Sequence, residues 1–261
     1  MTELEYFERI VPQTGDAVNV PSFLEKKVCV VLTAYNDEEA IPGAVTDFLS
    51  QRNVVKVIVV DNNSRDRTRL FAKDRGAEVV VERNQGYGFA CIGGLKKALA
   101  CEDADVIVLA EGDMSFRGDD IWKLLPFVDD VDLVVGSRTH MTLNDSQMDW
   151  FYLWGNLLMA KILQLRFVNP KFLGRTRFTD VGCTMRAIKK TSLERIIGDL
   201  KVGGHHFAPH MTMMALRRGL KVVEVPINYR KRIGVSKGAG GNRTLAIKTG
   251  IMMLWQIITL S

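Results

Sequence analysis

The chain has 261 residues, of which 47% are hydrophobic and 25% are charged, and its formal net charge is +5. This composition is typical of a globular protein with one large domain and a well-developed core. A mild basic excess suits phosphate-rich ligands or an anionic membrane surface. The sequence has no long Lys/Arg run and no nucleic-acid-binding module, so we expect no nucleic-acid partner.

The cysteines and the apolar segments together predict a cytoplasmic protein. Cys29, Cys91, Cys101 and Cys183 form no Cys-x-x-Cys pair, which favours reduced structural thiols over disulfides or zinc ligands. Residues 1–27 have no apolar signal core, and no segment reaches the ~18 uninterrupted apolar residues of a spanning helix. We therefore expect a soluble protein or one held peripherally at the cytoplasmic face of a membrane.

Strands and helices alternate through the first half of the chain. After an N-terminal extension (residues 1–27), we expect strands at 28–32, 54–60, 78–82 and 105–110, with helices at about 41–51, 68–75 and 86–100. Such alternation predicts an α/β fold with a mostly parallel sheet flanked by helices. Polar clusters follow the first, second and fourth strands, at the edge where such sheets bind ligands.

The second half is less regular. We expect helices at 121–127, 150–167 and 209–218, strands at 132–136, 181–188 and 220–229, and a basic, Gly-rich loop at 230–242. Residues 28–242 are predicted to form one catalytic domain, followed by an apolar helix at 243–261. The aromatic stripe of helix 150–167 is interpreted as core-facing, with a membrane interface as the alternative for this helix and the last one.

Glu111 and Asp113 form the strongest candidate metal site. Two carboxylates two residues apart at a strand end point to the same side. Mg2+ and Mn2+ prefer carboxylate oxygens and complete their coordination with substrate phosphates. The alternative is an acidic turn that caps the next helix.

Three further groups of polar residues follow predicted strands or lie near them. Asp61 could accept hydrogen bonds from a nucleotide, or it could cap the following helix. Several arginines and Lys237 would bind phosphate if the strand ends converge. For His205, His206 and His210 we favour structural or acceptor-lining roles, with one histidine as a third metal ligand as the alternative.

The order of these motifs resembles glycosyltransferase family 2, in the branch of the dolichyl-phosphate mannose/glucose synthases. The matching segments are residues 28–38 (VCVVLTAYNDE), 59–68 (VVDNNSRDRT, against VDDGSxDxT), 111–113 (EGD, at the Asp-x-Asp metal motif), 136–138 (GSR), 180–186 (DVGCTMR), 224–230 (EVPINYR) and 234–237 (GVSK). Glu111 replaces the first Asp of the metal motif. His210 stands where many relatives carry a Glu, and the membrane helices of some relatives are absent.

The resemblance implies a GT-A fold, a UDP- or GDP-sugar donor, Mg2+ or Mn2+, inversion at the sugar carbon and a polyprenyl-phosphate acceptor. It assigns the donor nucleotide to Thr33, Tyr35, Asn36, Glu38, Asp61 and Asn63, the metal to Glu111 and Asp113, and the acceptor phosphate to Arg138, Arg186, Arg230, Arg232, Ser236 and Lys237. From the histidine cluster itself, His206 is the candidate for the alternative role of third metal ligand. Asp113 and Arg138 are also the expected catalytic residues, with Asp120 as a candidate base. A phosphate acceptor is already anionic and needs no strong base.

Other functions remain open at this stage. A hydroxyl acceptor on a small molecule or glycan would need a base, for which Asp120 or a histidine is the candidate. A nucleotidyltransferase is disfavoured because no Gly-rich phosphate loop follows the first strand. A catalytically silent nucleotide-sugar binder is compatible with the altered metal motif and with His210.

Overall fold

The structure is a computed structural model that describes residues 21–139, 150–167, 177–234 and 243–259. Its strands are β1 (Val28–Ala34), β2 (Val54–Asp61), β3 (Glu78–Val81), β4 (Val106–Glu111), β5 (Leu133–Ser137), β6 (Arg186–Lys189) and β7 (Val222–Pro226). Its helices are α2 (Ile41–Leu49), α3 (Thr68–Asp74), α4 (Tyr87–Leu99), α5 (Ile121–Leu124), α6 (Trp150–Arg166), α7 (Lys190–Ile196), α8 (Phe207–Arg217) and α9 (Arg243–Thr259).

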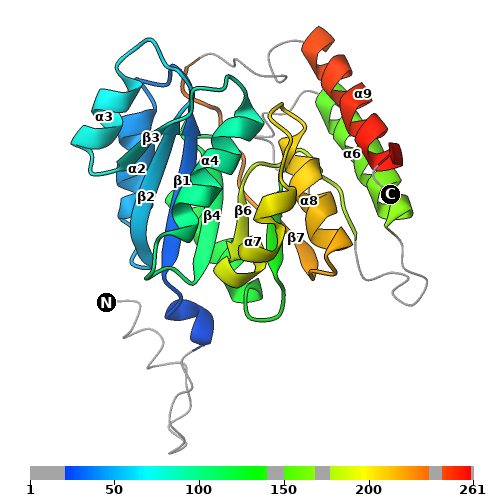
Figure 1. Ribbon diagram of the computed structural model, residues 1–261, viewed down its shortest axis with the longest axis horizontal. Coiled ribbons are helices and arrows are strands. Elements are labelled where there is room, and N and C mark those ends of the chain that lie inside the picture. The colour runs from blue at the N-terminus through cyan, green and yellow to red at the C-terminus, as the bar shows by residue number, and fades with distance from the viewer. Residues whose placement is uncertain (1–20, 140–149, 168–176, 235–242, 260–261) are drawn as a thin grey trace, which may run out of the picture.

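The seven strands form one sheet in the order β3-β2-β1-β4-β6-β5-β7 (Figure 1). All pairs are parallel except those of β6, which runs antiparallel to both β4 and β5. The predicted mostly parallel sheet flanked by helices is therefore confirmed. The strand expected at 181–188 begins only at Arg186, because only residues 186–189 pair with β4. Residues 181–182 form a turn, and residues 183–185 have no regular secondary structure.

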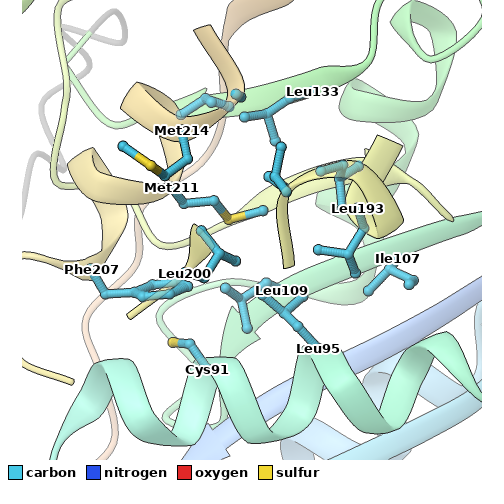
Figure 2. Close-up of a cluster of buried hydrophobic side chains, with 14 of the residues drawn as sticks. Cys91, Leu95, Ile107, Leu109, Leu133, Leu193, Leu200, Phe207, Met211 and Met214 are labelled. Carbon is cyan, nitrogen blue, oxygen red and sulfur yellow. The ribbon is translucent and has the colours of Figure 1, made fainter. Parts of the chain in front are cut away.

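The core lies on both faces of the sheet. Every residue of β1 is buried, as its continuous apolar sequence predicts for a central strand. Figure 2 shows part of one cluster, where Cys91 and Leu95 of α4 face Leu109 of β4. All four cysteines are buried and free, which suits structural thiols. Burial raises the pKa of the Cys29 thiol to about 12, so this thiol is protonated and unreactive at neutral pH.

Two adjacent glycines of α4 allow a matched test of this packing. A Cβ on Gly94 would lie 2.3 Å from Val31 Cγ1 and 2.6 Å from Val60 Cγ2, whereas one on Gly93 would meet only the Glu82 side chain, at 3.2 Å. We expect Gly94→Ala to destabilise the protein by about 1–3 kcal/mol. Gly93→Ala should instead be neutral or stabilising by up to about 1 kcal/mol, through its higher helix propensity. Urea denaturation measures both, and equal effects would show that α4 does not pack this closely.

Helices α6 and α9 lie side by side at the end of the molecule away from α3 (Figure 1). Among the described helices, none is both long and apolar enough to cross a bilayer. Trp150 and Trp154 are 68% and 63% exposed, which corrects the interpretation that they belong to a core-facing stripe. The reason is that α6 reaches the core through other residues, Ala160 and Leu163, and packs mainly against α9.

Candidate functional site

The carboxyl ends of β2, β1 and β4 meet at one edge of the sheet, because these strands are parallel neighbours. Within the described part of the chain, the non-glycine residues with positive φ are Asn36 (51°), Asn63 (65°) and Met114 (66°), and each follows one of these strands. Such conformations are costly and concentrate at functional sites. The positive φ angles therefore indicate that this edge of the sheet is the functional site.

The turns after β1 and β2 are bound to each other. The Asn36 amide donates to Ser64 Oγ (2.9 Å), and the Arg65 amide donates to Asn36 Oδ1 (2.7 Å). The Glu38 amide donates to Asp66 Oδ2 (3.2 Å), and the Glu38 carboxylate pairs with Arg67. Of the residues expected to bind the nucleotide, Asn36 and Glu38 thus hold the neighbouring turn in place.

A cavity of about 670 Å3 opens at this edge, a volume that suits a small-molecule ligand. Six residues singled out from the sequence line it: Thr33, Tyr35, Glu111, Asp113, Arg232 and His205, the last of which is expected in a structural or acceptor-lining role. The other lining residues are Ala34, Asp37, Asn62, Arg65, Gln85, Gly86, Tyr87 and Ala90.

Glu111 and Asp113 interact closely in the cavity wall. Burial and the neighbouring Asp113 carboxylate raise the pKa of Glu111 to about 8. Asp113 Oδ1 accepts hydrogen bonds from the amide (2.9 Å) and hydroxyl (2.5 Å) of Ser115. Two facing carboxylates form an oxygen ligand set that fits a hard divalent cation.

The prediction of His206 as a third metal ligand is not supported. Within the described residues, no group of three or more His, Cys, Asp or Glu side chains could hold a metal. His206 precedes α8, and His205 lines the cavity in its place. His210 lies deeper, with Nε2 at 3.2 Å from the Asp199 carbonyl. A cation at Glu111 and Asp113 would therefore take its other ligands from phosphate and water.

Arg232 lies among the carboxylates of the cavity. Its Nη2 is 3.1 Å from Asp113 Oδ2 and 4.0 Å from Asp37 Oδ1, while its buried Nε has no hydrogen-bond partner among the residues that the structure describes. The Ile233 amide donates to the Asp113 carbonyl (2.9 Å), and the Arg230 amide donates to that of Ser115 (3.0 Å). The start of the basic loop therefore runs along the turn that carries the carboxylates. Ser236 and Lys237, predicted phosphate ligands, lie outside the described residues.

Asp61 is fully buried and is not part of the cavity wall. Its carboxylate accepts from Arg69 Nε (2.6 Å) and from the Ser64 amide (3.3 Å). Its neighbour Asn62 lines the cavity instead, and Asn62 Oδ1 accepts from the Gly86 amide (2.8 Å). Asn63 donates to the Arg83 carbonyl (2.6 Å). Asp61 thus supports the turn that carries Asn62.

Replacing Asp61 tests whether this turn binds the nucleotide. We expect Asp61→Ala to weaken nucleotide binding by about tenfold or more, at a cost of about 1–2 kcal/mol in stability. Asp105→Ala is the matched control, because Asp105 accepts from the Lys27 amide (2.9 Å) at the opposite end of the sheet. Calorimetric titration and urea denaturation measure the two effects. The N-cap of α3 is Arg67, so Asp61 does not cap that helix. If Asp61→Ala loses stability but binds nucleotide normally, Asp61 only stabilises the turn and has no role in nucleotide binding.

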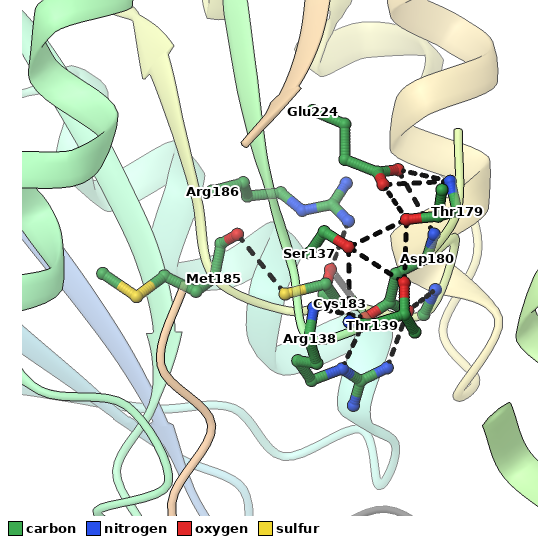
Figure 3. A network of polar contacts seen from close by, with 10 residues as sticks. Ser137, Arg138, Thr139, Thr179, Asp180, Cys183, Met185, Arg186 and Glu224 are labelled. Carbon is green, nitrogen blue, oxygen red and sulfur yellow. Dashed lines mark hydrogen bonds and ion pairs between the residues drawn. The ribbon is translucent and has the colours of Figure 1, made fainter. Parts of the chain in front are cut away.

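Arg138 belongs to a buried polar network that Figure 3 shows from close by. Its guanidinium forms a two-point ion pair with Asp180, at 2.7 and 2.9 Å, and lies 5.2 Å from the centre of the Tyr229 ring. Although burial acts in the opposite direction, the ion pair with Arg138 lowers the pKa of Asp180. Glu224 accepts from the amides of Thr179 and Asp180. Arg138 is therefore fixed in position, with its charge already paired.

Two residues predicted to act on substrate have structural positions. Arg186 is fully buried and donates to the carbonyls of Ala208 and Cys183, so it holds α8 against β6 and does not join the other arginines. Asp120 is also fully buried and pairs with Arg230 (2.6 Å) and Lys123 (2.8 Å). This pairing makes Asp120 a support for Arg230 and leaves it outside the cavity wall.

The start of α4 supplies residues that sequence reasoning missed. Gly86 (φ 150°) and Gly88 allow residues 202–203 to approach closely, since a Cβ on Gly88 would lie 2.0 Å from the Val202 carbonyl oxygen. This approach brings the His205 ring into a stack with Tyr87, with centroids 6.3 Å apart. Burial lowers the pKa of His205, which favours a neutral imidazole. The Gly86-Tyr87-Gly88 pattern was the available signal.

Comparisons with known proteins agree with this geometry. Residues 29–197 match glycosyl transferase family 2. The chain is 30% identical to the undecaprenyl-phosphate mannosyltransferase of Micrococcus luteus, covering 82% of this chain and 88% of that protein. It is 28% identical to the dolichyl-phosphate hexose transferase of Haloferax volcanii, covering 80% and 86%.

Solved structures give the same fold. Glucosyl-3-phosphoglycerate synthase from Mycobacterium tuberculosis, solved in complex with Mn2+, uridine diphosphate and phosphoglyceric acid, superimposes with a TM-score of 0.65 at 17% identity. The match covers 92% of this chain and 81% of that one. The expected GT-A fold is thereby confirmed.

Proposed function

Because the chain belongs to glycosyl transferase family 2, we propose that it transfers a sugar from a nucleotide diphosphate sugar to a polyprenyl phosphate. Relatives named for transfer to undecaprenyl and dolichyl phosphate support this acceptor class. The observation that carries the proposal is the cavity at the sheet edge, where a carboxylate pair and Arg232 face the same space. That arrangement can bind a cation and a phosphate group together.

In the proposed complex the nucleotide lies against Thr33, Tyr35 and Asn62, and the diphosphate lies toward Glu111 and Asp113. These two carboxylates would hold Mg2+ or Mn2+, and the bound cation would supply stabilisation of negative charge on the diphosphate leaving group. Asp113 is kept in orientation by its two hydrogen bonds from Ser115. The Asp113 carboxylate also forms an ion pair with Arg232, so its charge has a partner within the protein.

The acceptor phosphate would be positioned by Arg230, Arg232 and the basic loop that follows them. An anionic phosphate oxygen attacks the anomeric carbon opposite the leaving diphosphate, so we propose inversion at that carbon. The incoming oxygen needs no deprotonation by a strong base. This agrees with the position of Asp120, whose carboxylate already pairs with Arg230 and Lys123.

The proposed location is the cytoplasm, because the four cysteines are free, buried and suited to a reducing compartment. A polyprenyl phosphate resides in a bilayer, so the proposed reaction requires the enzyme to reach a membrane surface.

A transfer assay with labelled UDP- and GDP-sugars and Mn2+ tests the proposal. Three acceptors separate the alternatives: undecaprenyl phosphate, undecaprenol without the phosphate, and phosphoglyceric acid as a soluble acceptor. We expect label in the organic phase with undecaprenyl phosphate alone. Equal transfer to undecaprenol would contradict the role of the phosphate, and transfer to phosphoglyceric acid alone would replace the lipid acceptor. Donor binding without any transfer would indicate a silent binder.

A further inference from the structure

Helices α6 and α9 present large apolar side chains to solvent. On α6 these are Trp150, Trp154, Leu158 and Leu165, with exposures of 58–75%, and on α9 they are Ile247, Ile251, Trp255 and Ile258, with exposures of 54–69%. We call these eight residues the α6–α9 face. The two helices contact each other and lie side by side, so both groups of exposed apolar residues are at the same end of the molecule (Figure 1).

The exposed residues are aligned along each helix. With 100° of rotation per residue, the four positions on α6 fall within an arc of about 80°, and so do the four on α9. The buried residues lie on the opposite sides: Ala160 and Leu163 on α6, and Met253 and Ile257 on α9. Each helix therefore has one apolar side that builds the core and a second that the described part of the molecule leaves uncovered. A second apolar side of this kind marks an interaction surface.

The charges on these helices indicate what covers the face. Residues 150–166 and 243–259 contain Lys161, Arg166, Arg243 and Lys248 and no acidic residue. All four basic residues are exposed. Tryptophan side chains together with lysine and arginine are typical of helices that lie at the boundary between lipid headgroups and acyl chains. Cations close to an anionic lipid surface are attracted to it, and salt weakens that attraction.

We propose that the α6–α9 face docks the protein on an anionic lipid bilayer, with both helices lying in the plane of the membrane. A second copy of the chain is a poorer occupant, because self-association would bring like-charged helices together. The exposed apolar residues and the basic residues that support this surface do not depend on which sugar donor or which acceptor the protein uses. If the proposed function holds, the same surface brings the enzyme to its lipid acceptor.

Vesicle binding tests the proposal without donor, metal or acceptor. The protein is mixed with vesicles of phosphatidylcholine alone or with added phosphatidylglycerol, and co-sedimentation is measured. We expect binding that rises with the anionic lipid and falls with salt. Three of the four tryptophans lie on the two helices, so their emission should shift to shorter wavelength. The fourth, Trp122, donates to Gln51 (2.9 Å) elsewhere in the fold and should report no change.

Two matched variants make the test specific. Leu158 on the α6–α9 face is 58% exposed, and Leu70 on α3, at the other end of the molecule, is 54% exposed. Leu158→Glu should weaken vesicle binding by about tenfold, because it replaces an apolar side chain that would be buried in the bilayer with a charged one. Leu70→Glu adds the same charge and should leave binding unchanged. Ile251→Glu provides a second variant on α9 if Leu158→Glu folds poorly.

The opposite results would overturn the proposal. An intact protein that ignores vesicles of every composition, or a Leu70→Glu variant that loses as much binding as Leu158→Glu, would exclude this surface as a membrane contact. A concentration-dependent dimer that Leu158→Glu dissociates would assign the face to a second copy. Vesicle binding without sugar transfer would leave the surface intact and refute only the proposed function.

Discussion

Replacing Asp113 with asparagine should lower sugar transfer by about a thousandfold, a loss typical of removing one preorganised group that stabilises transition-state charge. The asparagine carbonyl can still accept the hydrogen bonds from Ser115, so the turn should keep its conformation. What disappears is the negative charge that faces Arg232 and that would bind the metal. Steady-state transfer with Mn2+ measures the change.

A remote carboxylate provides the control for this prediction. The Asp103 side chain is 77% exposed, and Asp103→Asn removes the same charge without touching the cavity. It should transfer sugar at the wild-type rate. If Asp113→Asn is folded, as judged by its thermal transition, and retains wild-type turnover, Asp113 is not a catalytic ligand.

The second large effect concerns the buried ion pair of Arg138 and Asp180. We expect Asp180→Ala to destabilise the protein by about 3–5 kcal/mol, because it leaves the Arg138 guanidinium buried without a counter-charge. The Arg138 and Gly182 amides would also lose their acceptor. Urea denaturation, followed by far-UV circular dichroism, measures the free energy of unfolding.

The pair between Arg218 and Asp199 is the matched comparison. It has similar two-point geometry, at 2.6 and 3.0 Å, but its side chains are 55% and 31% exposed. Solvent screening should make the loss of stability in Asp199→Ala much smaller than the loss in Asp180→Ala. Equal losses for the two variants would mean that burial does not control the contribution of these ion pairs.

The sequence predicted the fold well because the relevant signals are local. Continuous apolar runs such as 28–32 are typical of buried parallel strands, and alternation with helices determines which edge of the sheet carries the polar turns. Glu111 and Asp113 could be placed at the cavity for the same reason, since a strand end fixes their common direction. The antiparallel insertion of β6 left no such local signal, because it depends on pairing with β4 and β5.

The direction of individual polar side chains could not be predicted in this way. Arg186 and Arg232 are both basic residues near strand ends, yet one is fully buried against backbone carbonyls and the other lines the cavity. Which arrangement occurs depends on how α8 packs on β6 and on the contact of residues 230–233 with the Asp113 turn. His205 likewise reaches the cavity because Gly86 and Gly88, at the start of α4, have no side chains and let residues 202–203 pack against them.

The most direct test is calorimetric titration of the wild-type protein with UDP- and GDP-sugars, in Mn2+ and in EDTA. Our central claim is that the cavity at the ends of β1, β2 and β4 binds a nucleotide diphosphate sugar through a cation held by Glu111 and Asp113. We expect at least one donor to bind in Mn2+, with an affinity about tenfold or more lower in EDTA, a difference of about 1.4 kcal/mol. Equal affinity in Mn2+ and EDTA, or no binding of any donor in Mn2+, would contradict the claim.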